Sequence, residues 1–185
     1  MPAPTALVRL GLFALAGAAV LTGTKHRPNP AAPLTPADGH TIHVLAPHVV
    51  NGVRMGPYHH YCKILSPEPV IECLCYESAD SNARLAQVEY ILAKSITRTN
   101  AISLDNWNRN WHDHAQEIAT GRVQVLDLPA DQAKQVADVV AQTDGIIFHL
   151  WAAGEPVPSG RVHIAQSVGH VSISAGEKFT RPAGE

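Results

Sequence analysis

Residues 70–76 read VIECLCY, a run with the length and composition of a β-strand. A second run, IIFHLW at residues 146–151, has the same buried-strand character. Residues 133–140 place apolar side chains at helical spacing after Pro129, which predicts an amphipathic helix. Strands and helices thus mix without regular βαβ alternation. We therefore expect an α+β fold: one compact domain with a mixed or antiparallel sheet and a few packed helices.

The other segments give weaker periodicities. Residues 83–97 fit a strand that runs into a short helix. Residues 41–50 suggest a loop or a short helix, and the polar residues 100–110 suggest a loop or a frayed helix end. Residues 116–126 flank a Thr-Gly pair and predict a hairpin, whereas residues 162–174 fit a last strand or a loop.

The chain divides into three parts. Residues 1–23 contain a short apolar run after Arg9, which is typical of a signal peptide; an uncleaved N-terminal anchor is the alternative. Residues 24–39 form a proline-rich linker, and residues 40–185 form the folded domain. We therefore expect an exported protein, secreted or periplasmic, whose membrane contact is limited to the N-terminal segment.

The composition is that of a globular protein. Of the 185 residues, 45% are hydrophobic and 16% are charged, and the formal net charge is −2. No basic stripe is present that could neutralise phosphates, so we do not expect nucleic acid as a partner.

The most informative feature is a set of histidines with aromatic neighbours. They occur in YHHYCK at residues 58–63, WHDH at 111–114 and FHLW at 148–151. Histidine binds metals and titrates near neutral pH. Three such clusters in a short chain predict that they converge on one site.

The order of several short motifs is distinctive. These motifs are HHYCK at 59–63, NARL at 82–85, VEYI at 88–91, WH at 111–112 with His114 and Glu117, and FHLW at 148–151. In this order they resemble the oil body-associated protein family, a domain of unknown function with plant, fungal and bacterial members. The resemblance covers roughly residues 57–173.

The resemblance implies association with seed lipid droplets for the plant members and no established reaction. The family usually has Thr-Trp before the last histidine, where this chain has Ile147 and Phe148. The export signal is a second departure, so lipid-droplet residence is not carried over. The expectation that remains is affinity for a lipid or another small apolar ligand.

A metal site is one interpretation of the histidines. His112 and His114 are two apart, so on an extended chain both side chains face one way. Glu89 or Glu117 could add a carboxylate, and such a set suits zinc, iron, copper or nickel. The candidate metal ligands are His59, His60, His112, His114 and His149.

Two other interpretations compete with the metal. The histidines could form a polar network in the core, with structural roles only. Alternatively, His60 or His112 could transfer a proton while Glu89 or Glu117 orients the ring, as in acid–base catalysis. The protein is thus either a binding protein for an apolar molecule or an enzyme that acts on a small organic substrate.

The remaining candidates concern ligand contacts. The candidate ligand-binding residues are Tyr61, Arg84, Tyr90, Trp111 and Trp151, for which core packing or a surface ion pair is the simpler explanation. The histidines in or near the linker are excluded from the site, namely His26, His40, His43 and His48.

The three cysteines leave the redox state open. A disulfide from Cys62 to Cys73 or Cys75 is possible, and buried free thiols are the alternative. On a strand Cys73 and Cys75 share a face and would not bridge each other.

Overall fold

The computed structural model of this chain describes residues 38–99, 101–151 and 156–174, which belong to one compact unit, residues 34–185. The predicted signal segment and nearly all of the predicted linker lie outside the described residues. Among the described residues, no helix is long and apolar enough to cross a bilayer.

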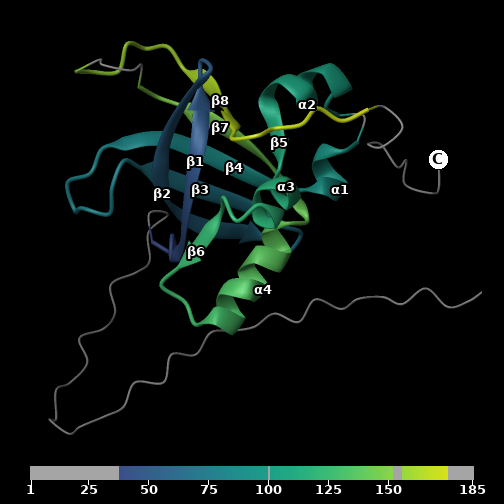
Figure 1. The fold of residues 1–185 in the computed structure, drawn as a ribbon, viewed down its shortest axis with the longest axis horizontal. Coiled ribbons are helices and arrows are strands. Elements are labelled where there is room, and N and C mark those ends of the chain that lie inside the picture. Colours follow the sequence, from purple (N-terminus) through teal and green to yellow (C-terminus); the bar gives the residue numbers. More distant parts are fainter. Residues whose placement is uncertain (1–37, 100, 152–155, 175–185) are drawn as a thin grey trace, which may run out of the picture. The chain divides into compact units, whose positions relative to one another are not determined.

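The described residues of the unit form eight strands and four short helices (Figure 1). The strands are β1 (Ile42–Val50), β2 (Val53–Ser66), β3 (Val70–Tyr76), β4 (Leu85–Ala93), β5 (Trp111–Asp113), β6 (Gln124–Leu126), β7 (Thr143–His149) and β8 (His163–Ser167). The helices are α1 (Lys94–Thr97), α2 (Leu104–Asn110), α3 (His114–Ala119) and α4 (Ala130–Val140).

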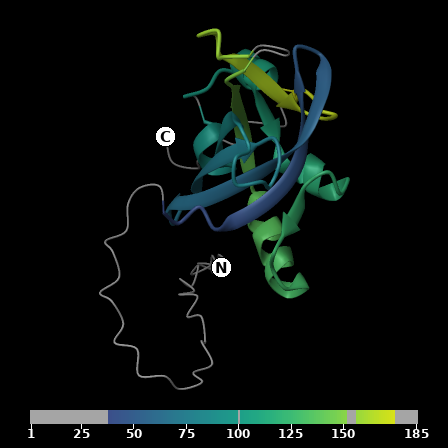
Figure 2. The same ribbon diagram turned by 90° about the vertical axis from the view of Figure 1, so that its left-hand side faces the viewer.

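Six of the strands form a closed antiparallel barrel. Their order is β2-β3-β4-β7-β8-β1, and β1 also pairs with β2, which closes the ring. Figure 2 shows the long strands β1 and β2 curving around one side of the barrel. The two short strands are additions to this ring, because β6 pairs with β1 and β5 pairs with β7.

Side chains that alternate along the strands point into the barrel and fill its interior. In β3, Ile71, Cys73 and Cys75 are buried and alternate with partly exposed residues. They pack with residues of β2 and β4, including Tyr58 and Ile91. The disulfide joins Cys62 to Cys73, which face each other across β2 and β3, and Cys75 is buried and free.

The predicted antiparallel sheet with a few packed helices is present, but the structure is mostly β. The predicted fold class, α+β, therefore overestimated the contribution of the helices. The segments predicted from clear periodicity are confirmed: β3, β7, α4, and the strand β4 that runs into α1. Residues 162–174 contain β8, one of the two alternatives.

Three local predictions were wrong or incomplete. Residues 41–50 are not a loop or a short helix but strand β1, whose register shifts at Pro47. Residues 116–126 are not a hairpin, because α3 begins at His114 after the Asp113 side chain accepts a hydrogen bond from the Ala115 amide. Residues 100–110 contain helix α2, with Ser103 at its N-cap.

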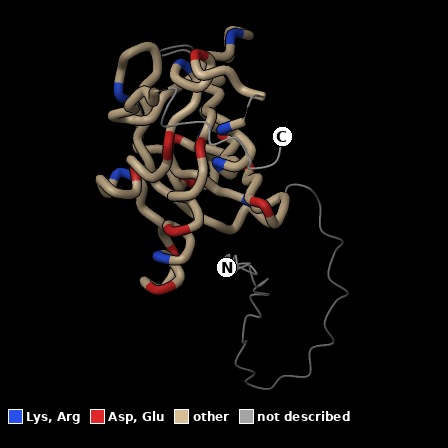
Figure 3. Tube along the Cα trace, turned by 90° about the vertical axis from the view of Figure 1, so that its right-hand side faces the viewer, with Lys and Arg blue, Asp and Glu red and all other residues tan. Residues whose placement is uncertain are grey.

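Charged residues are interspersed along the fold. In Figure 3 the positive and negative positions alternate over the trace and do not separate into opposite sides.

Candidate metal centre in the barrel

The interior of the barrel contains a cluster of imidazoles and carboxylates. Its members are His48 of β1, His60 of β2, Glu89 of β4, His112 of β5, and His114 and Glu117 of α3. Each of these six residues is exposed by 3% or less. The cluster thus gathers side chains from the first, second and fourth strands and from one short segment, residues 111–119.

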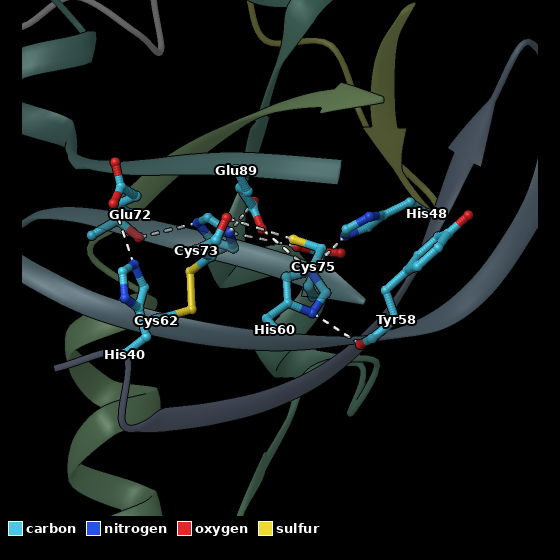
Figure 4. Close-up of a disulfide and its surroundings, with 12 residues drawn as sticks. His40, His48, Tyr58, His60, Cys62, Glu72, Cys73, Cys75 and Glu89 are labelled. Atoms are coloured by element: carbon cyan, nitrogen blue, oxygen red, sulfur yellow. Dashed lines mark hydrogen bonds and ion pairs between the residues drawn. A yellow bond between two sulfur atoms is a disulfide. The ribbon is translucent and has the colours of Figure 1, made fainter. Parts of the chain in front are cut away.

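Glu89 lies at the centre of this cluster. Its Oε2 is 3.4 Å from His60 Nε2. Its Oε1 is 3.2 Å from His112 Nε2 and 3.3 Å from His114 Nε2. His48 joins through His60, because their Nε2 atoms are 3.3 Å apart. Figure 4 shows His48, His60 and Glu89 pointing toward one another beside Cys75.

Gly145 of β7 makes room for the cluster. A Cβ at this position would lie 2.5 Å from Glu89 Oε1 and 2.6 Å from His112 Nε2. Real Cβ atoms do not approach so closely, so any larger residue would displace the carboxylate or the imidazole. On this side, Glu89 and His112 therefore pack directly against the main chain of Gly145.

Acceptors on the far side of three rings fix which nitrogen faces inward. The carbonyl oxygen of Tyr58 accepts from His60 Nδ1 at 3.0 Å, and a carbonyl can only accept. Gln87 Oε1 is 2.6 Å from His48 Nδ1, while the amide nitrogen of Gln87 donates to His149. In neutral His48 and His60, Nδ1 thus carries the proton and Nε2 presents a lone pair.

His114 is held in the same way. Its Nδ1 is 3.1 Å from the Thr143 hydroxyl. That hydroxyl donates its single proton to the Val140 carbonyl at 2.6 Å, so it accepts from His114 Nδ1. A neutral His114 therefore also directs the lone pair of Nε2 toward Glu89.

Burial and ion pairing perturb the pKa values of the cluster. Burial, together with the charge of His60, lowers the pKa of His48 to about 3. Burial would raise the pKa of Glu89, but hydrogen bonds from His112 and His114 outweigh it and hold that pKa well below its ordinary value. Burial would lower the pKa of His114, but Glu89 raises it above the ordinary value.

Glu117 is the second buried carboxyl. Its Oε2 lies 3.6 Å from His112 Nε2 and 4.0 Å from His114 Nε2. Its Oε1 is buried and has no hydrogen-bond partner among the described residues. Burial raises the pKa of Glu117. Glu117 thus has an unused oxygen beside two imidazoles.

A buried ion-pair network holds the segment that carries His112 and His114. Arg98 donates to Asp113 at 2.7 Å and to both oxygens of Asp144, at 2.7 and 3.0 Å. Trp107 Nε1 also donates to Asp144, at 3.0 Å. This network joins α1, α2 and β5 to β7, and it fixes β5 against the barrel.

Two groups of residues in the cluster could hold a metal ion. One is His48, His60 and Glu89, and the other is Glu89, His112 and His114; within each group the donor atoms lie within 4.8 Å of one another. Imidazole nitrogens with a carboxylate suit zinc, iron, copper and nickel.

The structure brings together five of the candidates from the sequence: His60, His112, His114, Glu89 and Glu117. It does not bring His59 to the cluster, because neighbours on a strand face opposite ways. His59 instead lies 2.9 Å from His43 Nε2. His149 faces inward but contacts Gln87 at 3.0 Å, not the carboxylates.

The candidate ligand-binding residues lie apart from the cluster. Tyr61 stacks on His43, and the Tyr90 hydroxyl donates to Glu72. Arg84 pairs with Glu77 and lies 4.4 Å over the Trp151 ring. Trp111 is buried in β5, where the alternation of a strand directs it away from its neighbour His112.

Sequence reasoning missed His48. We had excluded it with the linker histidines, but it lies in β1 at 1% exposure and belongs to the first metal-ligand group. The available signal was its place in an apolar stretch, APHVV at residues 46–50. The supporting residues Gln87, Thr143 and Gly145 carried no signal without the fold.

The profile of a protein family of unknown function, DUF1264, matches residues 34–180. The chain belongs to this family. It is also 31% identical to oil body-associated protein 1B of Arabidopsis thaliana over 112 residues, which are 60% of this chain and 45% of that protein. The resemblance drawn from the ordered motifs is thus confirmed.

Two maize relatives give similar values. The identity is 30% over 104 residues to oil body-associated protein 1A of Zea mays and 33% over 110 residues to protein 2B. The aligned part covers 55% and 58% of this chain and 42% of each relative, so this chain matches less than half the length of the relatives. No solved structure matches this chain.

Proposed function

We propose that this protein is a metalloprotein whose barrel holds a divalent transition metal between Glu89 and the inward-facing histidines. One observation carries this proposal. The Nε2 atoms of His48 and His60 are 3.3 Å apart, although in both rings the Nδ1 atom already donates a hydrogen bond, to Gln87 and to Tyr58 respectively. Two neutral imidazoles in this state face each other with lone pairs and cannot hydrogen-bond.

A cation explains this arrangement better than a closed hydrogen-bond network does. Buried polar groups are normally paired, and facing acceptors repel. A metal ion accepts electron pairs from both nitrogens at once and is favoured by the Glu89 charge. The hydrogen bonds at Nδ1 are the usual second contacts of metal-binding histidines.

We further propose that the metal serves a reaction on a small organic molecule. A bound transition metal polarises oxygen atoms or lowers the pKa of bound water, and Glu117, whose Oε1 has no hydrogen-bond partner among the described residues, is placed to move a proton beside it. The relatives are named for association with oil bodies, which favours an apolar molecule or a lipid.

Export remains part of the proposal. The disulfide between Cys62 and Cys73 supports it, because disulfides persist in secreted and periplasmic proteins and are rare in the cytosol.

Elemental mass spectrometry of the full chain, purified without a histidine tag, tests the metal. We expect at least one zinc, iron, copper or nickel ion per chain, and His60→Ala/His112→Ala, which removes one histidine from each ligand group, should greatly reduce this content. The matched control is His43→Ala/His59→Ala, which removes two histidines that pair with each other outside the cluster. Wild-type protein that is folded, contains no metal and takes up none would overturn the proposal.

A further inference from the structure

We infer that the centre is dinuclear, with the carboxylate of Glu89 bridging two metal ions. The inference rests on the proposed function and specifies it further. It concerns how many ions the cluster holds and which residues hold each one.

The four histidines form two pairs around Glu89. His60, with His48 behind it at 3.3 Å, faces Oε2 of Glu89. His112 and His114, whose Nε2 atoms are also 3.3 Å apart, both face Oε1. Oε2 thus contacts His60, with His48 in the same donor group, and Oε1 contacts both His112 and His114, which is the arrangement expected of a carboxylate that bridges two ions.

A single ion could not use all of these donors in the observed arrangement. With bonds of about 2.1 Å, any two ligand atoms on one ion lie within about 4.2 Å of each other. The donors of the described residues fall into two groups within a limit of 4.8 Å, and both groups contain Glu89. A single ion held by one group could therefore not reach both imidazoles of the other group.

The number of donors also suits two ions. The first ion would take His48, His60 and Oε2 of Glu89. The second would take His112, His114 and Oε1 of Glu89, and Glu117 lies close enough to His112 to join it. A bridging water would bring the first ion to tetrahedral coordination, and paired ions about 3.5–4 Å apart commonly share such a water.

Two carboxylates limit the charge of the centre. Glu89 and Glu117 are buried, and the hydroxide formed from a bridging water would add a third negative charge. Three negative charges leave a net charge of about +1 on two divalent ions, which is a smaller burial cost than two uncompensated cations.

Titration of the metal-stripped full chain with Co²⁺ tests the inference, because the optical spectrum of Co²⁺ reports bound ions directly. We expect saturation at about two ions per chain. His48→Ala/His60→Ala and His112→Ala/His114→Ala should each retain about one ion. Saturation of the wild type at a single ion would overturn the bridge and leave the metalloprotein proposal standing.

A second measurement needs no variant, in case the variants fail to fold. Electron paramagnetic resonance of wild-type protein loaded with Cu²⁺ should show coupling between two spins bridged by a carboxylate. An uncoupled signal of isolated Cu²⁺ at full loading would overturn the bridge. Failure of the wild type to bind either Co²⁺ or Cu²⁺ would overturn the proposed function itself.

Discussion

Individual hydrogen-bond acceptors orient the imidazoles of the centre. The Tyr58 carbonyl, the Gln87 amide oxygen and the Thr143 hydroxyl each contact an Nδ1 atom. None of these acceptors is hydrogen-bonded to Glu89. Each one nevertheless decides which nitrogen carries the proton in the ring that it contacts, namely His60, His48 or His114. Gly145 acts by size alone, since its missing Cβ leaves room for Glu89 and His112.

Thr143→Val tests one of these acceptors without changing the size of the side chain. The substitution leaves the Nδ1 proton of His114 without an acceptor, so the ring loses its fixed orientation. We expect the Kd for Zn²⁺ to rise by about 10–100-fold, as for other second contacts of metal-binding histidines. Isothermal titration of the metal-stripped protein measures it.

The matched control is Thr120→Val, whose hydroxyl donates to the main-chain oxygens of Gln116 and Glu117 at the end of α3. It should leave the Kd for Zn²⁺ unchanged. Equal effects of the two substitutions would contradict the role of Thr143.

At the level of elements, the segment from β5 to α3 contributes more side chains to the cluster than any other segment of the described residues. It supplies His112, His114 and Glu117 in only six residues. The change from strand to helix at Asp113 brings His112 and His114 together, with 3.3 Å between their Nε2 atoms. The pairing of β5 with β7 puts His112 opposite Gly145.

Arg98→Gln tests what holds this segment. It removes the positive charge that pairs with the fully buried Asp144, and one of the two that pair with Asp113, which keeps its ion pair with Lys94. Because an unpaired buried charge is costly, we expect the free energy of unfolding to fall by about 3 kcal/mol. Urea denaturation monitored by circular dichroism measures the change.

Arg109→Gln provides the comparison, since Arg109 pairs with Asp105 in an exposed i,i+4 ion pair. It should cost less than about 1 kcal/mol. A loss of that small size for Arg98→Gln as well would show that the network does not hold β5.

Sequence patterns predicted the elements that have one clear period. Strand β3 and helix α4 were recognised for this reason. Strand β1 was missed because Pro47 and the shift of register interrupt its alternation. Helix α3 was missed because its six residues are too few to show a helical period, and its start depends on the side chain of Asp113.

The site was predictable to the extent that its residue types were conspicuous. His112 and His114 stood out by their spacing, and Glu89 by its apolar neighbours. His48 did not, because only the closure of the barrel through β1 and β2 puts it beside His60. The proton position on His48 and His114 could not be predicted, since it depends on Gln87 and Thr143, which other strands contribute.

The barrel as a whole encloses titratable groups whose protonation affects its stability. In the metal-free protein His48 has a pKa of about 3, below the ordinary value of 6.5, so the unfolded chain binds its proton first as the pH falls. The pKa of His60 is lowered as well, mainly by burial. His114 has the opposite shift, because its pKa is raised. Its protonation therefore stabilises the folded state below about pH 6.5, and this stabilisation is lost as the pH rises through the raised pKa.

We therefore expect the metal-free barrel to lose stability below about pH 6.5, by up to about 1.4 kcal/mol per pH unit for His48 alone. Urea denaturation in the presence of a chelator, at about pH 6 and about pH 4, measures the loss. His48→Gln cannot titrate at this position and should reduce the slope. An identical slope in this variant would contradict the burial of a neutral His48.

The disulfide stabilises the same barrel by linking β2 to β3 across a sequence separation of 11 residues. Restricting a loop of this length in the unfolded chain contributes about 3 kcal/mol. Cys62→Ala/Cys73→Ala should lower the free energy of unfolding by about that amount and leave the metal content unchanged. A double variant as stable as the wild type would contradict this role.

The central claim is that metal ions lie between the paired imidazoles, and anomalous diffraction from a crystal tests it most directly. Data collected at the absorption edge of the metal found in the protein should show peaks about 2.0–2.2 Å from the Nε2 atoms of the paired histidines and from the oxygens of Glu89. Ordered waters at hydrogen-bond distance, with no anomalous signal inside the barrel after metal soaking, would contradict it.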